Sequence, residues 1–353
     1  MRILVLGRLF FIALIATATA AYGQQKLNSL QDLNGNAFSY ESIERDSWWN
    51  VANKRGGEAA KRIWIPAYFF LPAGSGQSRP QKRPAVVIVH GVGGLYKADN
   101  SKRVYWDYAK KLADNGIAAL IIDVHGARSQ GRLSVADSGK VDISSFVADS
   151  IFAAEMLRTH PAIDPERIGV LGFSKGGQAA LLAIDQRYID AYSKSAFPFK
   201  AAAAVYPGCN VVIEHPHVSR NSSVLLLFPK LETVSNERTC RSVVENLSKA
   251  GVQVHFEVYQ GARHAWDEDI PATAISDRVS LNCEWKQGDD GQVRTSDYKV
   301  IVARKERLAE PNTIWWETYQ RACLQPVTAI YEGNSALRER SLQEVVEFFR
   351  EAL

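Results

Sequence analysis

The sequence predicts an α/β fold in which helices cover both faces of a mostly parallel central sheet. Continuous apolar runs such as residues 85–89 are typical of strands buried on both faces. Amphipathic segments of about ten to twenty residues separate these runs, as in folds that alternate strands with helices. Within residues 167–184 the hydrophobic pattern changes from strand-like to helix-like. The chain has 353 residues and 46% apolar content, enough for a sizeable core.

Residues 1–23 have the pattern of a secretory signal peptide. Two arginines, Arg2 and Arg8, precede or flank a short apolar core, and small residues offer cleavage after Ala20 or Gly23. The apolar run is shorter than the ~20 residues of a bilayer span, which favours cleavage over a membrane anchor. We therefore expect an exported protein, periplasmic or extracellular, with no stable membrane span after the signal is removed. Removing both arginines lowers the net charge from +4 to 4 − 2 = +2, so nothing predicts a nucleic-acid partner.

Four cysteines follow the signal, at 209, 240, 283 and 323. An exported chain is free to form two disulfides from them, and four thiols allow three pairings. The interpretation that we favour joins Cys209 to Cys240 and Cys283 to Cys323. Because no C-x-x-C pair is present, a metal site is the weaker interpretation and none is predicted.

The remaining chain predicts an irregular, polar N-terminal extension over 24–60 and a single domain over 61–353. Residues 62–72 predict an edge strand or hairpin, since prolines are tolerated only at the margin of a sheet. Further strands are expected at 85–89, 117–123, 168–171, 200–206, 223–228 and 252–259, and helices at 102–115, 142–160, 178–184, 237–250 and 341–353. Residues 270–330 break this alternation and predict a C-terminal insertion stapled by Cys283 and Cys323. Its tryptophans are interpreted either as a lid or rim or as plain packing residues: Trp285, Trp315 and Trp316.

The turn between the strand at 168–171 and the helix at 178–184 carries Ser174. Glycines two residues before and two residues after it, Gly172 and Gly176, allow the strand and the helix to approach closely. Such a turn forces the serine into a strained conformation that exposes its hydroxyl. The sequence therefore predicts a nucleophile elbow with Ser174 as the nucleophile.

A serine nucleophile needs a base, and on a doubly wound sheet the base follows the nucleophile in the order Ser, acid, His. Four histidines lie beyond Ser174. His255 lies within a predicted strand, and His215 and His217 lie in a loop that precedes the predicted acid. His264 follows the last strand, in a loop near the carboxyl end of the sheet, and is the predicted base.

The acid is expected in the loop after the strand at 223–228. Glu232 is the only carboxylate there before the next helix, and Glu237 is the alternative. The oxyanion needs two backbone N–H donors. We expect one from Lys175, at a helix N-terminus, and the other from Val92, in the glycine-rich loop 90–94.

These motifs, in this order, resemble those of the α/β-hydrolase superfamily and, within it, the dienelactone hydrolase family. The resemblance rests on 90–94, 172–177, Glu232 and 261–266, with further similarity at 123–128 and 206–209, and it covers roughly residues 60–268. It implies an α/β-hydrolase fold. The sequence departs from the family at two places: the nucleophile is a serine instead of a cysteine, and the acid loop reads Pro229-Lys230-Leu231-Glu232 instead of Gly-x-x-Asp.

The expected function is that of a secreted serine hydrolase that cleaves an ester, a lactone or an amide of a small molecule by acyl transfer, without a cofactor or metal. His125 and Arg128 are candidates for contacting an acidic or polar substrate, with a structural salt bridge as the alternative for Arg128. The oligomeric state stays open. One alternative is a peptidase of the prolyl-oligopeptidase type, although the roughly 60 residues before the first predicted strand are too few for a propeller. The other is a non-catalytic binding protein on a hydrolase scaffold.

Overall fold

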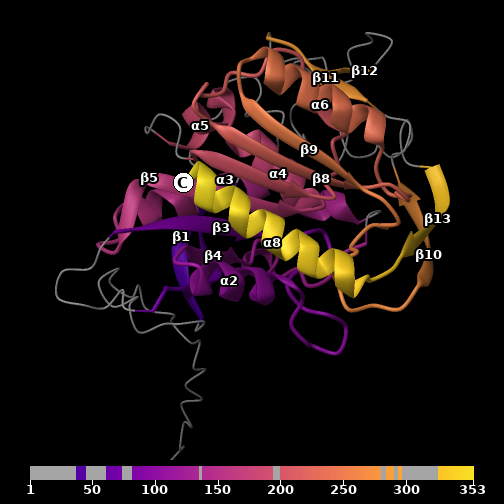
Figure 1. The fold of residues 1–353 in the computed structure, drawn as a ribbon, viewed down its shortest axis with the longest axis horizontal. Coiled ribbons are helices and arrows are strands. Elements are labelled where there is room, and N and C mark those ends of the chain that lie inside the picture. The colour runs from indigo at the N-terminus through magenta and orange to yellow at the C-terminus, as the bar shows by residue number, and fades with distance from the viewer. Residues whose placement is uncertain are drawn as a thin grey trace, which may run out of the picture.

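An eight-stranded sheet with the order β1-β2-β4-β3-β5-β6-β8-β9 forms the centre of the molecule (Figure 1). The computed structural model describes residues 37–44, 61–73, 82–134, 137–193, 199–279, 284–289, 293–295 and 325–353. The sheet strands are β1 (Ala37–Glu44), β2 (Lys61–Phe70), β3 (Arg83–Val89), β4 (Ala118–Ile122), β5 (Ile163–Phe173), β6 (Ala201–Val205), β8 (Ser223–Pro229) and β9 (Gln253–Tyr259). From β4 to β9 all neighbouring strands are parallel, whereas β1 and β2 pair antiparallel. The predicted mostly parallel sheet is confirmed.

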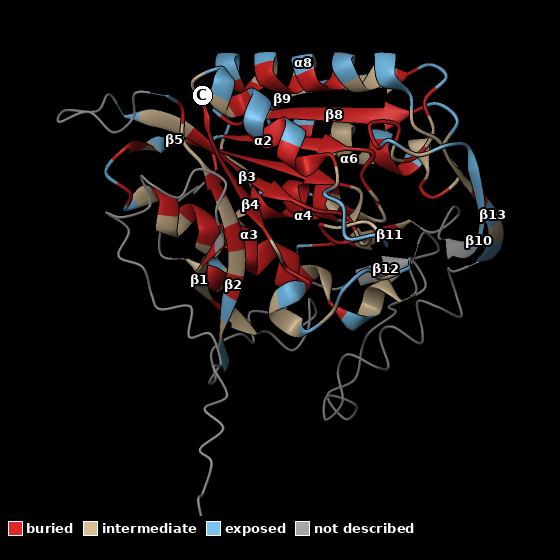
Figure 2. Cartoon of the chain, turned by 90° about the horizontal axis from the view of Figure 1, so that it is seen from below, coloured by how far each residue is buried: buried red, intermediate tan, exposed pale blue. Residues whose placement is uncertain are grey.

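Helices cover both faces of this sheet (Figure 2). One face packs against α2 (Tyr105–Asp114) and α8 (Ser335–Ala352), which share one buried apolar cluster with the strands. The other face packs against α3 (Ile143–Arg158), α4 (Lys175–Ala183), α5 (Gln186–Tyr192) and α6 (Glu237–Lys249), which share a second cluster. The strands β3, β4, β6 and β8 are almost entirely buried because both of their faces are covered.

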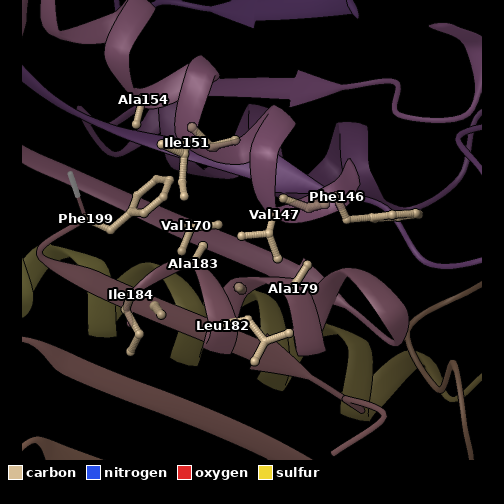
Figure 3. Packing of buried hydrophobic residues seen from close by; sticks show 14 of the residues in the cluster. Phe146, Val147, Ile151, Ala154, Val170, Ala179, Leu182, Ala183, Ile184 and Phe199 are labelled. Carbon is tan, nitrogen blue, oxygen red and sulfur yellow. The ribbon is translucent and has the colours of Figure 1, made fainter. Parts of the chain in front are cut away.

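The helix after the elbow, α4, packs against the sheet and against α3, which lies on the same face (Figure 3). Val147 of α3 and Val170 of β5 are fully buried in the same cluster as Ala179 and Ala183 of α4. Alanines at these positions allow close approach between the two helices and the sheet, so the N-terminus of α4 is fixed where Ser174 precedes it.

Most predicted helices are present with shifted ends. The α3 helix begins after Asp142, whose side chain accepts a hydrogen bond from the Ser144 N–H at 2.8 Å. The last helix begins at Ser335 instead of 341, because Asn334 caps it through a hydrogen bond from the Leu337 N–H at 3.0 Å. The apolar pattern alone marked only the half of α8 that packs most closely on the sheet.

The expectation of an irregular N-terminal extension is wrong for Ala37–Glu44, which form β1. This strand pairs with β2 along its whole length and buries Phe38 and Tyr40. Its buried polar groups are also bonded: the Tyr40 hydroxyl donates to the Asp149 carbonyl at 2.7 Å, and the Ser42 hydroxyl donates to the Asp149 carboxylate at 2.6 Å. The mixed polar and apolar pattern did not predict this strand, because its buried polar side chains form hydrogen bonds with α3.

Because β1 lies at the edge, β2 is the second strand of the sheet and not an edge strand as expected. Pro66 is tolerated there because the ladder with β4 begins only at Ala67. The Pro66 carbonyl accepts a hydrogen bond from the Asp123 N–H at 2.8 Å. The N–H and C=O of one residue in an antiparallel strand point to the same side. The Pro66 carbonyl points toward β4, so an N–H at this position would also point away from β1, and its absence removes no hydrogen bond to β1.

The predicted insertion departs from the sheet after β9 and forms short pairings of its own. β10 (Thr273–Val279) pairs antiparallel with β13 (Gln325–Tyr331), and β11 (Trp285–Gln287) lies between β12 (Val293–Thr295) and β7 (Val211–Ile213). Trp285 is 1% exposed and belongs to the core, which agrees with the packing interpretation and not with a lid. The predicted signal peptide, residues 1–23, lies outside the described residues, as do Cys283, Trp315, Trp316 and Cys323.

A disulfide joins Cys209 to Cys240, as predicted. It links the loop after β6 to the first turn of α6, close to the loop that carries Glu232. In the part of the chain that the structure describes, no helix is both long and apolar enough to cross a bilayer.

Candidate active site

Ser174 lies in a sharp turn between β5 and α4. Its φ of 52° falls in the left-handed region that a serine rarely adopts. The turn is tight because a Cβ atom on Gly172 would lie 2.0 Å from the Gly176 carbonyl oxygen, and one on Gly176 would lie 2.3 Å from the Val89 oxygen. Glycine is therefore required at both places, and the predicted elbow geometry is present.

Three side chains from three strand ends meet in a chain of hydrogen bonds. The Ser174 Oγ lies 3.0 Å from Nε2 of His264, and Nδ1 of His264 lies 2.8 Å from a carboxylate oxygen of Glu232. A carboxylate only accepts, so Nδ1 carries the proton and Nε2 is free to accept the proton of Ser174. The structure thus brings the predicted nucleophile, base and acid together in the predicted order.

The acid loop is built to present one oxygen of Glu232 to the histidine. Its other oxygen accepts hydrogen bonds from the N–H groups of Thr233 and Val234, both at 2.7 Å. The side chains of His264 and Glu232 are only 5% and 3% exposed, so water competes little for this pair. Glu237, the alternative acid, instead bonds Lys230 and Arg241 at the surface.

Lys175 supplies a backbone N–H beside the nucleophile but keeps its side chain away from it. As the first residue of α4, its N–H has no acceptor within the helix. Its ammonium group donates to the carbonyls of Ser138 and Val141 and lies 5.0 Å from the centre of the Phe146 ring. Burial lowers the pKa of Lys175 to about 8. The backbone of this residue, and not its charge, faces the elbow.

The glycine-rich loop that contains Val92 lies against the elbow. A Cβ on Gly91 would lie 3.2 Å from the Ser174 Cβ, and the Gly91 N–H donates to the Tyr105 hydroxyl at 3.1 Å. The preceding residue, His90, is fully buried: its Nε2 accepts from the Val124 N–H at 3.1 Å, so its Nδ1 proton is donated to the Gly91 carbonyl at 2.7 Å. Burial lowers the pKa of His90, which keeps the ring neutral in this role.

The two predicted substrate contacts, His125 and Arg128, hold the structure together instead. Arg128 donates to the Asp149 carboxylate at 2.8 Å and to Glu44 at 3.1 Å, which matches the salt-bridge alternative. His125 stacks edge-on against His90 with ring centres 4.6 Å apart and bonds the Gly131 carbonyl at 2.9 Å. Burial lowers the pKa of His125 to about 2, so it is neutral and braces the glycine-rich loop.

Two tyrosines beside His264 were not identified from the sequence. The Tyr206 ring lies 4.9 Å from the imidazole, centre to centre, and the Tyr331 ring meets it edge-on at 5.7 Å. Tyr206 directly follows β6, and a position at the carboxyl end of a parallel strand is the signal that would have identified it. Tyr331 comes from β13, about 70 residues beyond His264, and no local pattern places it there.

No group of three or more His, Cys, Asp or Glu side chains in the described ranges is arranged to hold a metal ion. The arrangement around Ser174 is that of a nucleophile, a base and an acid, which can perform acyl transfer without further chemistry from a bound group.

Comparison with known proteins places the chain in a family and a fold. A model of the dienelactone hydrolase family matches residues 65–285. A probable 2-oxo-3-(5-oxofuran-2-ylidene)propanoate lactonase from Bradyrhizobium is 31% identical over 125 residues, which cover 33% of this chain and 45% of the relative. The thiohydrolase aneE from Aspergillus aculeatus is 33% identical over 98 residues, 28% of each chain. The match thus spans less than half the length of these curated relatives.

Among solved structures, a dienelactone hydrolase-like promiscuous phosphotriesterase from metagenomic libraries has a similar fold. The TM-score is 0.52 at 16% identity, and the superposition covers 90% of this chain and 98% of the other. At this identity the similarity concerns the fold alone.

Proposed function

Because the chain belongs to the dienelactone hydrolase family, we propose that it is a serine hydrolase that cleaves a carboxylic ester or lactone through an acyl-enzyme. The observation that carries the proposal is the unbroken chain of contacts from Ser174 through His264 to Glu232, at 3.0 and 2.8 Å. These distances lie within the range that proton transfer in the transition state requires.

In the proposed reaction the Ser174 oxygen attacks the substrate carbonyl while Nε2 of His264 takes its proton. Glu232 holds the proton on Nδ1 and stabilises the imidazolium that forms. The imidazolium then donates its Nε2 proton to the leaving oxygen, and the acyl group stays on Ser174. Water, activated in turn by Nε2, cleaves the acyl-enzyme and restores the serine.

The negative charge on the carbonyl oxygen would be stabilised by the backbone N–H groups of Lys175 and Val92. Support for Lys175 comes from its place at the N-terminus of α4, where the helix dipole favours an anion. Support for Val92 comes from the close approach of its loop to Ser174 at Gly91. Both donors are backbone groups, so neither depends on the chemistry of its own side chain.

The substrate class is drawn from the chemistry of the site and from the relatives. A serine triad transfers an acyl group from a carbonyl that carries a leaving group, and one relative is described as a probable lactonase. We propose a small ester or lactone. We also propose that the protein is exported, since residues 1–23 have the pattern of a signal peptide and the Cys209–Cys240 disulfide favours an oxidising compartment.

Turnover of p-nitrophenyl acetate, p-nitrophenyl butyrate and a small panel of lactones tests the proposal. The wild type is expected to turn over at least one of them with an initial burst of product equal to the enzyme concentration, because the acyl-enzyme accumulates. Ser174→Ala is expected to lower kcat by about 10³-fold or more. Absence of serine-dependent turnover across the panel would favour a non-catalytic binding protein.

The acid is tested by a matched pair of substitutions. Glu232→Gln removes the charge that stabilises the imidazolium, and kcat is expected to fall roughly 10²- to 10⁴-fold. Glu237→Gln removes a carboxylate that lies a few residues away and bonds only surface cations, so kcat should stay within about twofold of the wild type. An unchanged rate in Glu232→Gln would assign the acid to another residue.

A further inference from the structure

A buried carboxylate lies beneath the catalytic histidine loop and is not used by the proposed triad. Asp267 has no exposed surface, and its two oxygens accept hydrogen bonds from the Tyr206 hydroxyl at 2.8 Å and the Tyr108 hydroxyl at 3.0 Å. The Tyr108 hydroxyl also lies 2.9 Å from the hydroxyl of Ser341. Side chains from α2, α8, the end of β6 and the loop after β9 thus meet at this point.

Of the two tyrosines that bond Asp267, only Tyr206 is seen to touch the triad. Its ring lies 4.9 Å from the His264 ring, centre to centre, and also contacts Trp266 edge-on at 4.9 Å and Phe173 at 6.0 Å. Its backbone has a φ of 40°, an uncommon conformation for a tyrosine, and its N–H bonds the Leu227 carbonyl at 2.8 Å. Tyr206 is therefore fixed by its backbone, by its ring and by its hydroxyl.

The hydrogen bond to Glu232 fixes one point of the His264 ring but leaves rotation about that bond. Ring contacts on the faces and edges of the imidazole are needed to hold Nε2 toward Ser174. Tyr206 and Tyr331 supply such contacts from two different elements. Tyr206 can do so only if its ring is itself prevented from turning, and the bond from its hydroxyl to Asp267 prevents that.

We infer that Tyr206 is a positioning residue for His264 and that Asp267 holds Tyr206 in place through the tyrosine hydroxyl. This inference rests on the proposed function, since it assigns His264 as the base. A carboxylate is a costly way to fill this space, because burial of a charge without a cation opposes folding. Burial, together with nearby Glu268, raises the pKa of Asp267 to about 7. A phenylalanine at 206 would preserve the packing of the ring, so packing does not account for the hydroxyl–carboxylate pair.

A matched pair of substitutions separates positioning from stability. Tyr206→Phe and Tyr108→Phe each keep the ring and each remove one hydroxyl from the same carboxylate, but only Tyr206 contacts His264. Both variants are expected to lose stability toward urea, Tyr108→Phe somewhat more because the Tyr108 hydroxyl also contacts Ser341. Only Tyr206→Phe is expected to lower kcat, between about 5- and 100-fold, with KM within about twofold of the wild type. Equal kcat values in the two variants would overturn the inference.

The role of Asp267 is tested by combining substitutions. If Asp267 acts on catalysis through Tyr206, the double variant Tyr206→Phe/Asp267→Asn has the same kcat as Tyr206→Phe alone. If the two effects on kcat multiply, Asp267 does not act through Tyr206.

A second measurement does not depend on turnover. The Nδ1 proton of His264 is hydrogen-bonded to the buried carboxylate of Glu232. We expect such a proton to give an NMR signal far downfield. This signal is expected to broaden or shift in Tyr206→Phe and to stay unchanged in Tyr108→Phe. If the wild type turns over no ester or lactone, the proposed function fails, while this signal still shows whether Tyr206 positions His264. An unchanged signal in both variants overturns the positioning role.

Discussion

At the scale of single residues, Asp267 makes the stability of the protein depend on pH. Burial and the neighbouring Glu268 raise the pKa of its carboxyl group to about 7, while hydrogen bonds from Tyr206 and Tyr108 partly offset that rise. Glu268 itself is paired with Arg103 at 3.0 Å, so that cation does not neutralise Asp267 directly. The unfolded chain loses this proton near pH 4, whereas the folded chain keeps it until about pH 7. The native state therefore binds more protons between these values, and stability falls as pH rises through that window.

Replacing Asp267 by asparagine removes this dependence. Between pH 5 and pH 7 the free energy of unfolding of the wild type is expected to fall by roughly 2–3 kcal/mol more than that of Asp267→Asn, since one pKa unit corresponds to about 1.36 kcal/mol. Urea unfolding of both proteins at pH 5 and pH 8 measures the difference. The stability of Asp267→Asn relative to the wild type is therefore expected to increase as pH rises. A difference that is constant with pH would mean that Asp267 is ionised throughout this range.

At the scale of elements, the elbow depends on contacts between backbones that no side chain can enter. Gly176 faces the end of β3, where a Cβ would lie 2.3 Å from the Val89 oxygen and 2.5 Å from the His90 oxygen. Backbone oxygens of a central strand cannot move aside as a flexible side chain can. The position of Ser174 is therefore set by β3 and α4 together, and not by the turn alone.

Gly176→Ala is accordingly expected to cost on the order of 3 kcal/mol or more in unfolding free energy and to abolish turnover. Gly131→Ala is the matched control. A Cβ at Gly131 meets nothing within 4 Å, so the free energy of unfolding should change by no more than about 0.5 kcal/mol. Urea unfolding and ester turnover measure both effects. A Gly176→Ala variant as stable and active as Gly131→Ala would contradict the packing described for the elbow.

The insertion contributes to the site at the same scale, through β13. The Ile330 N–H donates to the Thr233 hydroxyl at 3.1 Å, in the loop that carries Glu232. Glu332 pairs with Arg263 at 3.1 Å, next to His264. Buried Val234 and Ala329 pack together between the two segments. The strand β13 therefore braces both the acid loop and the histidine loop, although it lies far from either in sequence.

At the scale of the whole molecule, the sequence predicted those features that depend on a single segment or on chain order. The central strands were evident because continuous apolar runs are typical of strands buried on both faces. The sequence predicted that Ser174, His264 and Glu232 meet, because the elbow has a local glycine pattern and the order of the strands restricts where a base and an acid can lie. The Cys209–Cys240 disulfide belongs to the pairing that we favoured among the three possible ones.

The features that were missed depend on contacts between distant segments. β1 contains polar side chains that look irregular until α3 supplies Asp149 as their partner. For Arg128 the sequence offers a salt bridge as an alternative to a substrate contact, but it does not identify the partners, Glu44 and Asp149, which lie in other elements. Tyr206 and Tyr331 approach His264 only after β6 and β13 are in place. Apart from the position of Tyr206 at the end of a parallel strand, the pattern of one segment does not identify such partners.

The N-terminal strand gives a prediction for the molecule as a whole. β1 covers one edge of the sheet, contacts Asp149 of α3 through Tyr40 and Ser42, and contacts Arg128 through Glu44. A chain that begins at residue 24 retains this strand, whereas one that begins at residue 45 loses it. The shorter chain exposes apolar surface once covered by Phe38 and Tyr40 and removes two partners of the Asp149–Arg128 pair.

The chain that begins at residue 45 is expected to be less stable by on the order of 5 kcal/mol, or not to fold, because two buried aromatic side chains, three side-chain hydrogen bonds and the backbone ladder with β2 are lost. Should it not fold, Tyr40→Phe in the chain that begins at residue 24 tests the same contact. It removes only the bond to the Asp149 carbonyl and should cost about 1 kcal/mol. Urea unfolding measures each variant. Equal stability of the chains that begin at residues 45 and 24 would show that β1 does not contribute to the free energy of unfolding, and would contradict this prediction.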